Sequence, residues 1–420
     1  MFIVYDLIFI IFAILYIPYL TIRRKWHRGF CVRFGFIPKE TIKLLSAKKN
    51  IWIHAVSVGE VLAIVDLIEK LKKKFPNYQI VCSTVTKTGY KIASERLASL
   101  GVVIFAPLDF SWIIRTFVRA INPQIYIAAE TEIWPNLYTY LSRKGIPIVQ
   151  VNGRISDKAF KGYQKVKWLT RRVLGSVNVF CVQSDLDQER VIALGADPKR
   201  VRVFGNIKFD NVPQACDFKL EDLGFTSNQW LLVAGSTHPG EEVILMNTYR
   251  NLMNDFPQLR LVLVPRHVER SEEVVALVND QGFIPVRFST LGHAAIDAKT
   301  IVVVDEIGKL RTLYSLSKIV FIGKTLTVGG GQNMIEPAAF GRAIILGPHT
   351  YNFKDVVRIF LHEGALIQVN DNEELLARIK ALLRNSNEMN QMGLAAKRIV
   401  EKYQGATTKT VEVIEQIIKS

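Results

Sequence analysis

The sequence contains little cysteine and fewer acidic than basic residues. Its 420 residues include four cysteines, Cys31, Cys82, Cys181 and Cys216, and no C-x-x-C pair. Such scattered cysteines argue against a disulfide framework or a zinc site and are typical of a reducing compartment. With 54 Lys and Arg against 38 Asp and Glu, the formal net charge is +16. This excess favours anionic partners such as nucleic acid, acidic lipid or a phosphorylated substrate.

Several common motifs of nucleotide and metal chemistry are also missing. The chain has no G-x-x-x-x-G-K-[ST], no G-x-G-x-x-G and no H-E-x-x-H, and its seven histidines are dispersed. These absences argue against P-loop chemistry, against hydride transfer and against a metalloprotease-type zinc site. We therefore expect neither a bound metal nor an organic cofactor.

The amino-terminal end is a long apolar run. Within residues 1–22 only Asp6 is charged, and the basic cluster RRKWHR follows directly. At about 1.5 Å per residue, a helix of this length could just cross the roughly 30 Å hydrocarbon core. The charges follow the run and no small-residue cleavage site is present, which argues against a signal peptide. We expect a membrane anchor over residues 1–25 with the body on the cytoplasmic side; an interfacial helix and a buried core helix are the alternatives.

From residue 50 onward, apolar runs alternate with longer stretches of helical period. The predicted strands are IWIHAV, YQIVCST, VVIFAPL, QIYIAAE, IPIVQVN and VNVFCVQS, and then, after a break at 211–228, WLLVAG, RLVLVP, TIVVVD, KIVFIG and AIILG. Apolar strands alternating with helices are typical of a parallel sheet covered on both faces. We predict an α/β chain with two Rossmann-like domains, at 26–210 and 211–403, and a C-terminal helix over 404–420 that crosses back to the first domain.

Polar residues that directly follow an apolar strand are the site candidates, because ligands bind at the carboxyl ends of parallel strands. In the first half, Glu60 ends HAVSVGE, and Glu130 and Glu132 lie in AAETEIWPN. Glu60 at a helix start would be an ionised general base, although an acid there also simply complements the helix dipole. Arg154 in NGRIS and Lys208 in GNIKFD add positive charge, which suits a site that handles anions.

The second half contains three further candidate segments. AGSTHPGEE resembles an anion-binding loop at a helix start, and VPRH ends a strand with Arg266 and His267. The segment GGGQNMIEPAAFGRAIILGPHTYNF contains three glycines, which allow a ligand to approach the backbone closely. Glu336 begins a helix there, where a nucleotide-sugar site commonly holds ribose hydroxyls; as a first-turn acid alone, it would leave the glycines unexplained.

These motifs, taken in order, resemble a known enzyme family. The chain is similar to the 3-deoxy-D-manno-octulosonic acid (Kdo) transferases, which are lipid A-modifying GT-B glycosyltransferases, over essentially its whole length. The motifs that carry the resemblance are HAVSVGE, ETEIWPN, NGRIS, GNIKFD, STHPGEE, VPRHVER and GGGQNMIEPAAFGRAIILGPHTYNF. The resemblance implies that the two Rossmann-like domains face each other across a cleft, with an acceptor domain first and a CMP-sugar-binding domain second.

The resemblance also implies an activity and roles for individual residues. It implies transfer of Kdo from CMP-Kdo to a lipid A precursor, lipid IVA, at the cytoplasmic face of the inner membrane, with inversion and without a metal. Glu60 matches the family's catalytic base, and Glu130 and Lys208 match positions credited with stabilising the transition state. The positions that match CMP contacts are Pro265, Arg266, Ile307, Gly308, Lys309, Asn333, Met334, Ile335 and Glu336. The expected partners are the donor, the acceptor and anionic membrane lipids, and no nucleic acid is expected.

Three residues depart from the family pattern: Gln332 stands where the family usually has His, and Lys309 and Pro239 stand where it has Glu. Two alternative functions remain. The first is another nucleotide-sugar enzyme, either a GT-B transferase with a different donor or an epimerase, and an epimerase would not need the anchor. The second is a non-catalytic protein that binds acidic lipid, which would not need Glu60 and Glu130 together.

Overall fold

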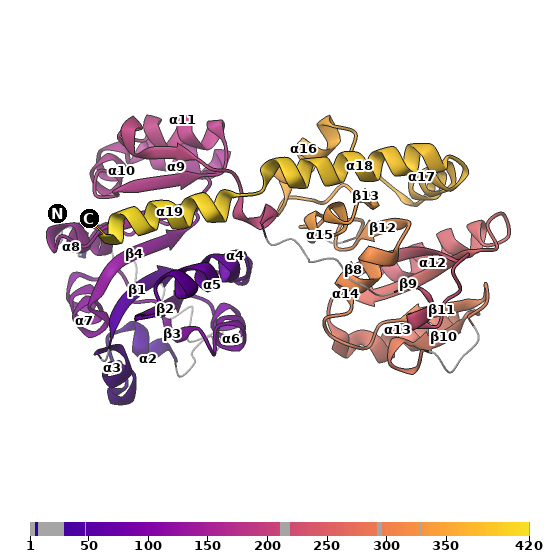
Figure 1. Ribbon diagram of the computed structural model, residues 1–420, viewed down its shortest axis with the longest axis horizontal. Coiled ribbons are helices and arrows are strands. Elements are labelled where there is room, and N and C mark those ends of the chain that lie inside the picture. The colour runs from indigo at the N-terminus through magenta and orange to yellow at the C-terminus, as the bar shows by residue number, and fades with distance from the viewer. Residues whose placement is uncertain are drawn as a thin grey trace. The chain divides into compact units, whose positions relative to one another are not determined.

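The computed structural model describes residues 5–6, 29–46, 48–210, 219–291, 296–327 and 329–419. The chain divides into two compact units, Met1–Asn211 with Tyr403–Ser420, and Val212–Lys402. In each unit a parallel sheet has helices on both faces (Figure 1). Apart from Tyr5 and Asp6, the predicted anchor over residues 1–25 lies outside the described residues. In the part of the chain that is described, no helix is long and apolar enough to cross a membrane.

The first unit contains a seven-stranded parallel sheet in the order β3-β2-β1-β4-β5-β6-β7. Its strands are β1 (Lys49–His54), β2 (Tyr78–Thr84), β3 (Gly101–Phe105), β4 (Pro123–Ala129), β5 (Ile148–Gly153), β6 (Val179–Val182) and β7 (Val201–Val203). Ile53 pairs with Cys82 on one side and with Ile127 on the other. The strand order reverses between β1 and β4, and doubly wound sheets bind ligands at such a switch point.

Helices bury both faces of this sheet. They are α2 (Gly29–Arg33), α3 (Lys39–Ser46), α4 (Val58–Ala63), α5 (Val65–Lys74), α6 (Lys87–Arg96), α7 (Ser111–Ile121), α8 (Pro135–Arg143), α9 (Asp157–Lys165), α10 (Lys167–Leu174), α11 (Asp185–Ala193) and α19 (Ala406–Lys419). Side chains alternate along a strand, so Trp52 of β1 packs with α7 and α8. Its neighbours Ile51 and Ile53 pack on the opposite face with α4, α5 and α19.

The last helix, α19, is part of the first unit although the second unit precedes it in sequence. Its Val411 and Ile414 are buried in the same cluster as the strands of the first sheet. The carboxylate of Asp210 accepts hydrogen bonds from the backbone N–H groups of Gly405 and Thr407, which fixes the start of α19. The core of the first unit is therefore completed by the end of the chain.

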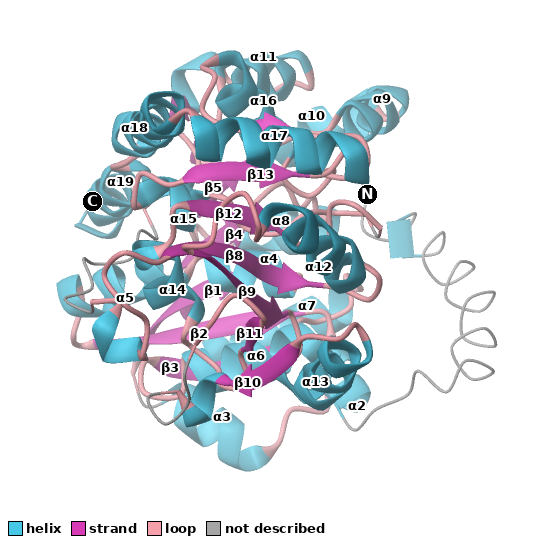
Figure 2. Ribbon diagram, turned by 90° about the vertical axis from the view of Figure 1, so that its right-hand side faces the viewer, coloured by secondary structure: helices cyan, strands magenta, loops and turns pink. Residues whose placement is uncertain are grey.

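The second unit repeats the architecture in the strand order β10-β11-β9-β8-β12-β13-β14. Its strands are β8 (Trp230–Thr237), β9 (Leu259–Pro265), β10 (Ile284–Arg287), β11 (Thr300–Val303), β12 (Ile319–Ile322), β13 (Ala343–Leu346) and β14 (Ile367–Gln368). Its helices are α12 (Glu241–Leu252), α13 (Ser271–Asp280), α14 (Leu310–Leu316), α15 (Ile335–Ala339), α16 (Lys354–His362), α17 (Asn372–Arg384) and α18 (Ser386–Tyr403). Helices α12, α13 and α17 cover one face, and α14 and α15 cover the other (Figure 2). The predicted pair of parallel α/β sheets is confirmed.

Candidate active site

The switch point of the first sheet brings two of the predicted acids to neighbouring strand ends. Glu60 follows β1 and Glu130 follows β4, and these two strands pair directly. Electrostatic influence of both Glu130 and Lys208 on the Glu60 carboxyl places all three side chains in one neighbourhood. The three predicted catalytic residues, which are far apart in sequence, therefore lie together in the first unit.

The Glu60 side chain is held by the turn that begins α4. Ser57 caps this helix: its hydroxyl donates to Glu60 Oε1 at 2.9 Å and accepts from the Glu60 N–H at 3.4 Å. The Val56 N–H donates to Glu60 Oε2 at 2.7 Å. This arrangement is close to a capping box. It fixes the carboxylate in one position. Stabilisation of the start of α4 is therefore one reason for an acid at this turn.

Burial raises the pKa of Glu60, and the negative charge of Glu130 raises it further. The Val56 N–H, the Ser57 hydroxyl and the charge of Lys208 act in the opposite direction but do not outweigh these effects. The helix start therefore does not hold this pKa low. A carboxylate with a raised pKa is a stronger base than an exposed one, which suits proton abstraction at neutral pH.

Glu130 and Lys208 form an ion pair beside Glu60. The Lys208 Nζ lies 3.9 Å from Glu130 Oε1, and the side chains are 24% and 31% exposed. Glu130 has a positive φ of 55°, a left-handed conformation that is uncommon for residues other than glycine and that clusters at functional sites. Both charged groups thus remain partly open to solvent, and to a ligand, at the strand end.

A network of amides holds Lys208 in place. Lys208 lies in a 3-10 turn, Ile207–Phe209, whose cap Asn206 accepts the Lys208 N–H at 3.0 Å. The Asn152 Oδ1 accepts the Ile207 N–H at 3.1 Å, and the Gln183 side chain donates to the Asn152 carbonyl at 3.0 Å. The motifs NGRIS and GNIKFD are therefore bonded to each other, and Asn152 positions the backbone beside Lys208.

Glu132 adds a third carboxylate to the site. Burial raises its pKa to about 7, and the charges of Glu60 and Glu130 contribute. The Tyr138 hydroxyl donates to the Glu132 backbone carbonyl at 2.6 Å, which fixes the loop. Close carboxylates cannot all ionise easily, so Glu132 carries a proton in much of the protein near neutral pH. The sequence identified Glu132 as a candidate but gave no reason to expect this protonation.

The protonation of Glu132 predicts a pH effect on stability. Its pKa in the folded protein lies above the ordinary value of 4.5, so folding favours the protonated form. The resulting stabilisation is complete below the ordinary pKa and is lost as the pH rises to about 7. In Glu132→Gln this dependence disappears, so the variant should gain stability relative to the wild type between about pH 5 and about pH 8. Thermal unfolding of both proteins at the two pH values measures the difference.

Glu189→Gln is the matched control, because Glu189 is an exposed acid of the same unit. It should follow the wild type at both pH values. If Glu132→Gln and the wild type lose the same stability over this range, Glu132 is not the group that titrates.

In the second unit, a buried acid joins the two loops of the switch point. Glu241, the first residue of α12, is fully buried. Its carboxylate accepts four backbone N–H groups, from His238 at 2.9 Å, Lys324 at 2.8 Å, Thr325 at 2.8 Å and Leu326 at 3.0 Å. The first lies in the loop after β8 and the others lie after β12, and these two strands are neighbours. Glu241 therefore sets the spacing of the two loops.

The second acid of the same motif is also used internally. Glu242 is fully buried and accepts the Thr237 hydroxyl at 2.8 Å and the Arg270 guanidinium at 2.8 Å. Arg270 ends the motif VPRHVER. The two acids of STHPGEE therefore support the loop architecture, while anion binding by the loop itself stays a prediction.

The positions predicted to contact CMP lie at the ends of strands of the second sheet or after them. Arg266 is exposed directly after β9, and its N–H donates to the Thr237 carbonyl at 3.0 Å. After β11, Ile307 is 83% exposed and Gly308 has a φ of 89°. The neighbouring Lys309 lies within 3.1 Å of the Glu306 carboxylate. These loops are exposed and carry cations, and Pro265 ends β9 as a buried residue.

Four of the predicted CMP contacts lie just before α15 or in its first turn. Two of them have polar side chains, and the other two are buried apolar residues. Asn333 accepts the Ile335 N–H at 3.0 Å and donates to the Glu336 carboxylate at 3.3 Å. Met334 and Ile335 are fully buried, so neither offers a side chain to a ligand. Arg311 of α14 lies 3.5 Å from the Glu336 carboxylate. The sequence reasoning missed Arg311, because it lies inside a helix rather than directly after a strand.

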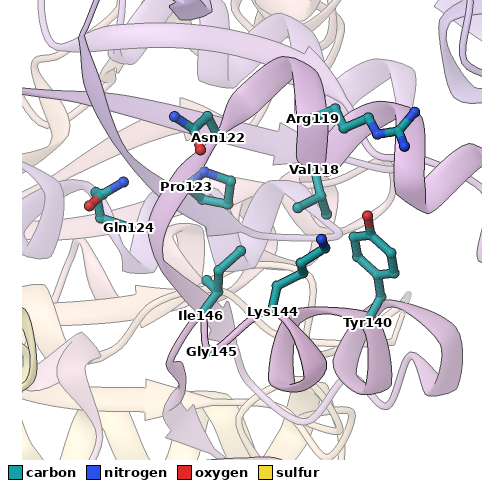
Figure 3. Close-up of a pocket in the computed structure, with 9 residues that line it drawn as sticks. All are labelled: Val118, Arg119, Asn122, Pro123, Gln124, Tyr140, Lys144, Gly145 and Ile146. Carbon is teal, nitrogen blue, oxygen red and sulfur yellow. The ribbon is translucent and has the colours of Figure 1, made fainter.

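Within the described residues, neither a metal cluster nor the pocket described below offers a carboxylate site that competes with this one. No group of three or more His, Cys, Asp or Glu residues in the described ranges could hold a metal ion. A pocket of about 450 Å³ lies where α7 and α8 end, beside the amino-terminal end of β4 (Figure 3). Glu60 and Glu130 follow the carboxyl ends of their strands. It is lined by Val118, Arg119, Asn122, Pro123, Gln124, Tyr140, Lys144, Gly145 and Ile146. This lining contains no carboxylate.

Comparison with known proteins gives a consistent result. A family model described as 3-deoxy-D-manno-octulosonic-acid transferase (kdotransferase) matches residues 28–211. The 3-deoxy-D-manno-octulosonic acid transferase of Haemophilus influenzae is 30% identical over 403 residues, which cover 94% of this chain and 92% of that protein. The protein of the same name from Chlamydophila psittaci is 31% identical over 370 residues, which cover 85% and 83%.

Among solved structures, the UDP-GlcNAc 2-epimerase of Neisseria meningitidis bound to UDP-GlcNAc is similar with a TM-score of 0.58. The match covers 89% of this chain and 100% of that chain at 11% identity. At this identity the similarity concerns the fold alone.

Proposed function

The chain belongs to the family of 3-deoxy-D-manno-octulosonic acid (Kdo) transferases, and from this premise we propose that it moves Kdo from CMP-Kdo to the lipid A precursor lipid IVA. The single observation that carries the proposal is the position of Glu60. Its carboxylate is fixed at the switch point of the first sheet, has a raised pKa and lies beside the Glu130–Lys208 pair. That combination provides one base and one cation at a strand end.

The proposed reaction is a single displacement with inversion. Glu60 takes the proton of an acceptor hydroxyl while the hydroxyl oxygen forms a bond to the anomeric carbon of Kdo. The bond from that carbon to the phosphate oxygen breaks, and CMP leaves with the electron pair. Lys208 balances negative charge near the reacting centre, and Glu130 holds the Lys208 ammonium and stabilises positive charge that develops on the sugar. This scheme requires no metal.

The donor half of the proposal rests on the second unit. Arg266 and Lys309 would balance the charge of the phosphodiester, since cations at strand ends commonly bind such groups. Glu336 would accept hydrogen bonds from ribose hydroxyls. Met334 and Ile335, which are fully buried, would support the position of Glu336 from within the unit.

The acceptor is proposed to be presented at a membrane surface. The formal net charge of +16 and the basic cluster after the apolar amino-terminal run suit an anionic bilayer. We propose that the protein attaches to the cytoplasmic face of the inner membrane through this amino-terminal region. Attachment confines enzyme and lipid to one surface and raises their encounter rate without changing the chemistry.

Release of CMP and analysis of the lipid product test the proposal together. The protein is incubated with CMP-Kdo, with and without lipid IVA, and the lipids are examined by mass spectrometry. The expected result is acceptor-dependent release of CMP and a lipid heavier by whole Kdo units. Release of CMP without an acceptor indicates a hydrolase or an epimerase-like enzyme. If no CMP is released either with or without lipid IVA, the protein uses a different donor or is a non-catalytic lipid-binding protein.

The assignment of the donor to the second unit predicts a selective kinetic effect. Glu336→Ala removes the carboxylate that Asn333 and Arg311 contact. The KM for CMP-Kdo should rise by roughly 10-fold or more, as for loss of a charged hydrogen bond of about 1.5–3 kcal/mol, while the KM for the acceptor changes little. Steady-state kinetics with each substrate varied in turn measures both. Glu363→Ala, at an exposed acid of the same unit, should change neither value, and a loss confined to acceptor use would contradict the assignment.

A further inference from the structure

Three neighbouring helices of the first unit contain several cations but no acid. Helices α7, α8 and α10 cover the face of the first sheet on which Trp52 lies, and α8 packs against both of the others. Their sequences, SWIIRTFVRAI, PNLYTYLSR and KWLTRRVL, include neither Asp nor Glu. The exposed cations of these helices and of the α8 C-cap are Arg115, Arg119, Arg143, Lys144, Lys167, Arg171 and Arg172. We call the three helices with Lys144 the basic layer.

Helix dipoles explain only some of these cations. A cation in the last turn of a helix is stabilised by the dipole, and Arg119, Arg143 and Arg172 lie in last turns. Arg115, however, lies in the middle of α7, and Lys167 is the first residue of α10. The dipole disfavours positive charge at a helix start. A second cause is therefore needed for the charge of the basic layer.

The helices on the other face of the same sheet carry both signs of charge. There Lys74 of α5 lies 3.0 Å from the carboxylate of Glu415 in α19. The ion pairs of the described residues do not include Arg115, Lys144 or Lys167. The positive charge of the basic layer is thus not neutralised by the layer itself, and it favours a partner that is negatively charged.

Two exposed tryptophans identify the kind of partner. Trp112, the second residue of α7, is 51% exposed, and Trp168, the second residue of α10, is 70% exposed. They lie on the two helices that α8 separates. Trp is enriched where a protein meets both lipid and water, because its ring is apolar and its N–H is polar. Nucleic acid would match the charge alone, whereas an anionic bilayer matches the charge and the exposed rings.

A pocket opens within the basic layer, where α7 and α8 end. Arg119 and Lys144 are the charged residues of its lining. The Lys144 ammonium and the Tyr140 hydroxyl point from the end of α8 toward α7 (Figure 3). Two cations and a hydroxyl donor suit the oxygens of a phosphate group. The pocket therefore matches the head group of a phospholipid.

We propose that the basic layer lies on an anionic bilayer and that its pocket takes the phosphate of a lipid head group. The loop that carries Glu130 and Glu132 leads directly into α8, the middle helix of the layer. The candidate site thus borders the surface that meets the lipid. The inference rests on the proposed lipid acceptor, and it names the surface of the first unit on which that acceptor is reached.

Matched charge reversals test the surface in the full chain. The layer variant combines Arg115→Glu, Lys167→Glu and Arg171→Glu. The control variant reverses exposed cations of α5, α6 and α19, on the other face of the sheet: Lys73→Glu, Arg96→Glu and Lys409→Glu. Both variants change the formal charge by the same amount, so a general electrostatic effect would weaken both equally. Binding is measured by titration with vesicles of phosphatidylethanolamine and phosphatidylglycerol, and with vesicles of phosphatidylcholine alone.

The layer variant should bind the anionic vesicles about 10-fold or more less tightly than the control variant, and the two should bind phosphatidylcholine alike. Equal binding to the anionic vesicles would overturn the proposal. Tighter binding of the wild type to single-stranded RNA than to these vesicles, lost in the layer variant, would assign the layer to nucleic acid instead. If glutamate lowers the unfolding temperature, the corresponding glutamine variants, which remove charge without reversing it, give the same comparison.

Quenching by brominated phosphatidylglycerol tests the contact of the rings. Trp168→Phe and Trp112→Phe should each lower the fraction of tryptophan emission that the bromine atoms quench, because quenching requires close approach to the lipid chains. Trp230→Phe, in the second unit, should not lower it. An unchanged quenched fraction in both Trp168→Phe and Trp112→Phe would contradict contact of the layer with the bilayer.

The head-group site is tested by pairs of variants within the layer. Arg119→Gln with Lys144→Gln and Arg115→Gln with Arg172→Gln remove the same charge, but only the first pair lines the pocket. The pocket pair should weaken binding to the anionic vesicles by roughly 10-fold more, as for loss of a charged hydrogen bond. Equal losses would contradict a head-group site in the pocket.

Activity separates this inference from the proposed function. The layer variant should turn over lipid IVA in detergent as the wild type does, and it should require a higher concentration of lipid IVA in anionic vesicles. Loss of turnover in detergent would contradict a role confined to the membrane surface. Absence of turnover by the wild type in both media would contradict the proposed function, while the vesicle titrations would still decide whether the basic layer binds lipid.

Discussion

Replacement of Glu60 by glutamine is expected to slow turnover by ~10²–10⁴-fold, the usual effect of losing a general base. The amide keeps the size of the side chain and an oxygen that can still accept the Val56 N–H, so the turn before α4 remains intact. What is lost is the ability to take a proton. Binding of CMP, measured by calorimetry, should be nearly unchanged because the nucleotide is proposed to bind to the other unit.

The control separates this role from helix capping. Glu69→Gln changes an exposed acid on the neighbouring helix α5 and should leave turnover unchanged. If Glu60 served only the capping box, Glu60→Gln would lower the unfolding temperature slightly and leave turnover within a few-fold of the wild type. Near-normal turnover of Glu60→Gln would therefore remove Glu60 from the proposed mechanism.

The second large effect is expected at Glu241, which touches no proposed ligand directly. In Glu241→Gln, one carboxylate oxygen becomes an NH₂ group that faces backbone donors. Each buried donor left unpaired costs about 1–3 kcal/mol, and Glu241 accepts four of them. Each oxygen accepts two of these N–H groups, so two donors lose their acceptor, and the free energy of unfolding of the second unit should fall by about 2–6 kcal/mol.

Hydrogen exchange locates this effect. The amides of residues 323–327 should lose protection in Glu241→Gln, and CMP binding should weaken because the loops after β8 and β12 are no longer held together. The amides of the first sheet should be unaffected. Glu269→Gln, an exposed acid of the same unit, is the control and should change neither. Retained protection in the loop after β12 would show that other contacts hold the two loops.

The sequence predicted every inner strand and one edge strand, β3, and missed the other three edge strands. Every strand expected from an apolar run is present, but β7, β10 and β14 were not expected. These three are edge strands of two to four residues. An edge strand has a partner on one side only, so it needs no continuous apolar run. Hydrophobic pattern alone cannot distinguish such a short strand from a loop.

The sequence predicted which site residues lie at the ends of strands. It did not predict which residues contact one another there. Glu60 and Glu130 could be paired in advance because residues after adjacent parallel strands share one edge. The bond from Asn152 to the backbone beside Lys208 could not, because no periodicity relates the two segments. The segment AGSTHPGEE is predicted to bind an anion through its Gly, Ser and Thr residues, and the sequence did not indicate that its two acids, Glu241 and Glu242, satisfy buried groups of the protein itself. Their roles depend on the packing of distant loops.

The position of α19 also has a consequence for synthesis on the ribosome. The first unit is translated first, yet its core includes Val411 and Ile414. The hydrogen bonds to the Asp210 carboxylate cannot form until Gly405 and Thr407 have been synthesised. At 5–20 residues per second, this delay lasts on the order of 10–40 s. During that time the whole of the second unit emerges and can fold, while the apolar side chains of the first unit that α19 packs against stay uncovered. A premature stop codon before α19, which has 14 residues, would therefore leave the earliest-made part of the protein without this part of its core.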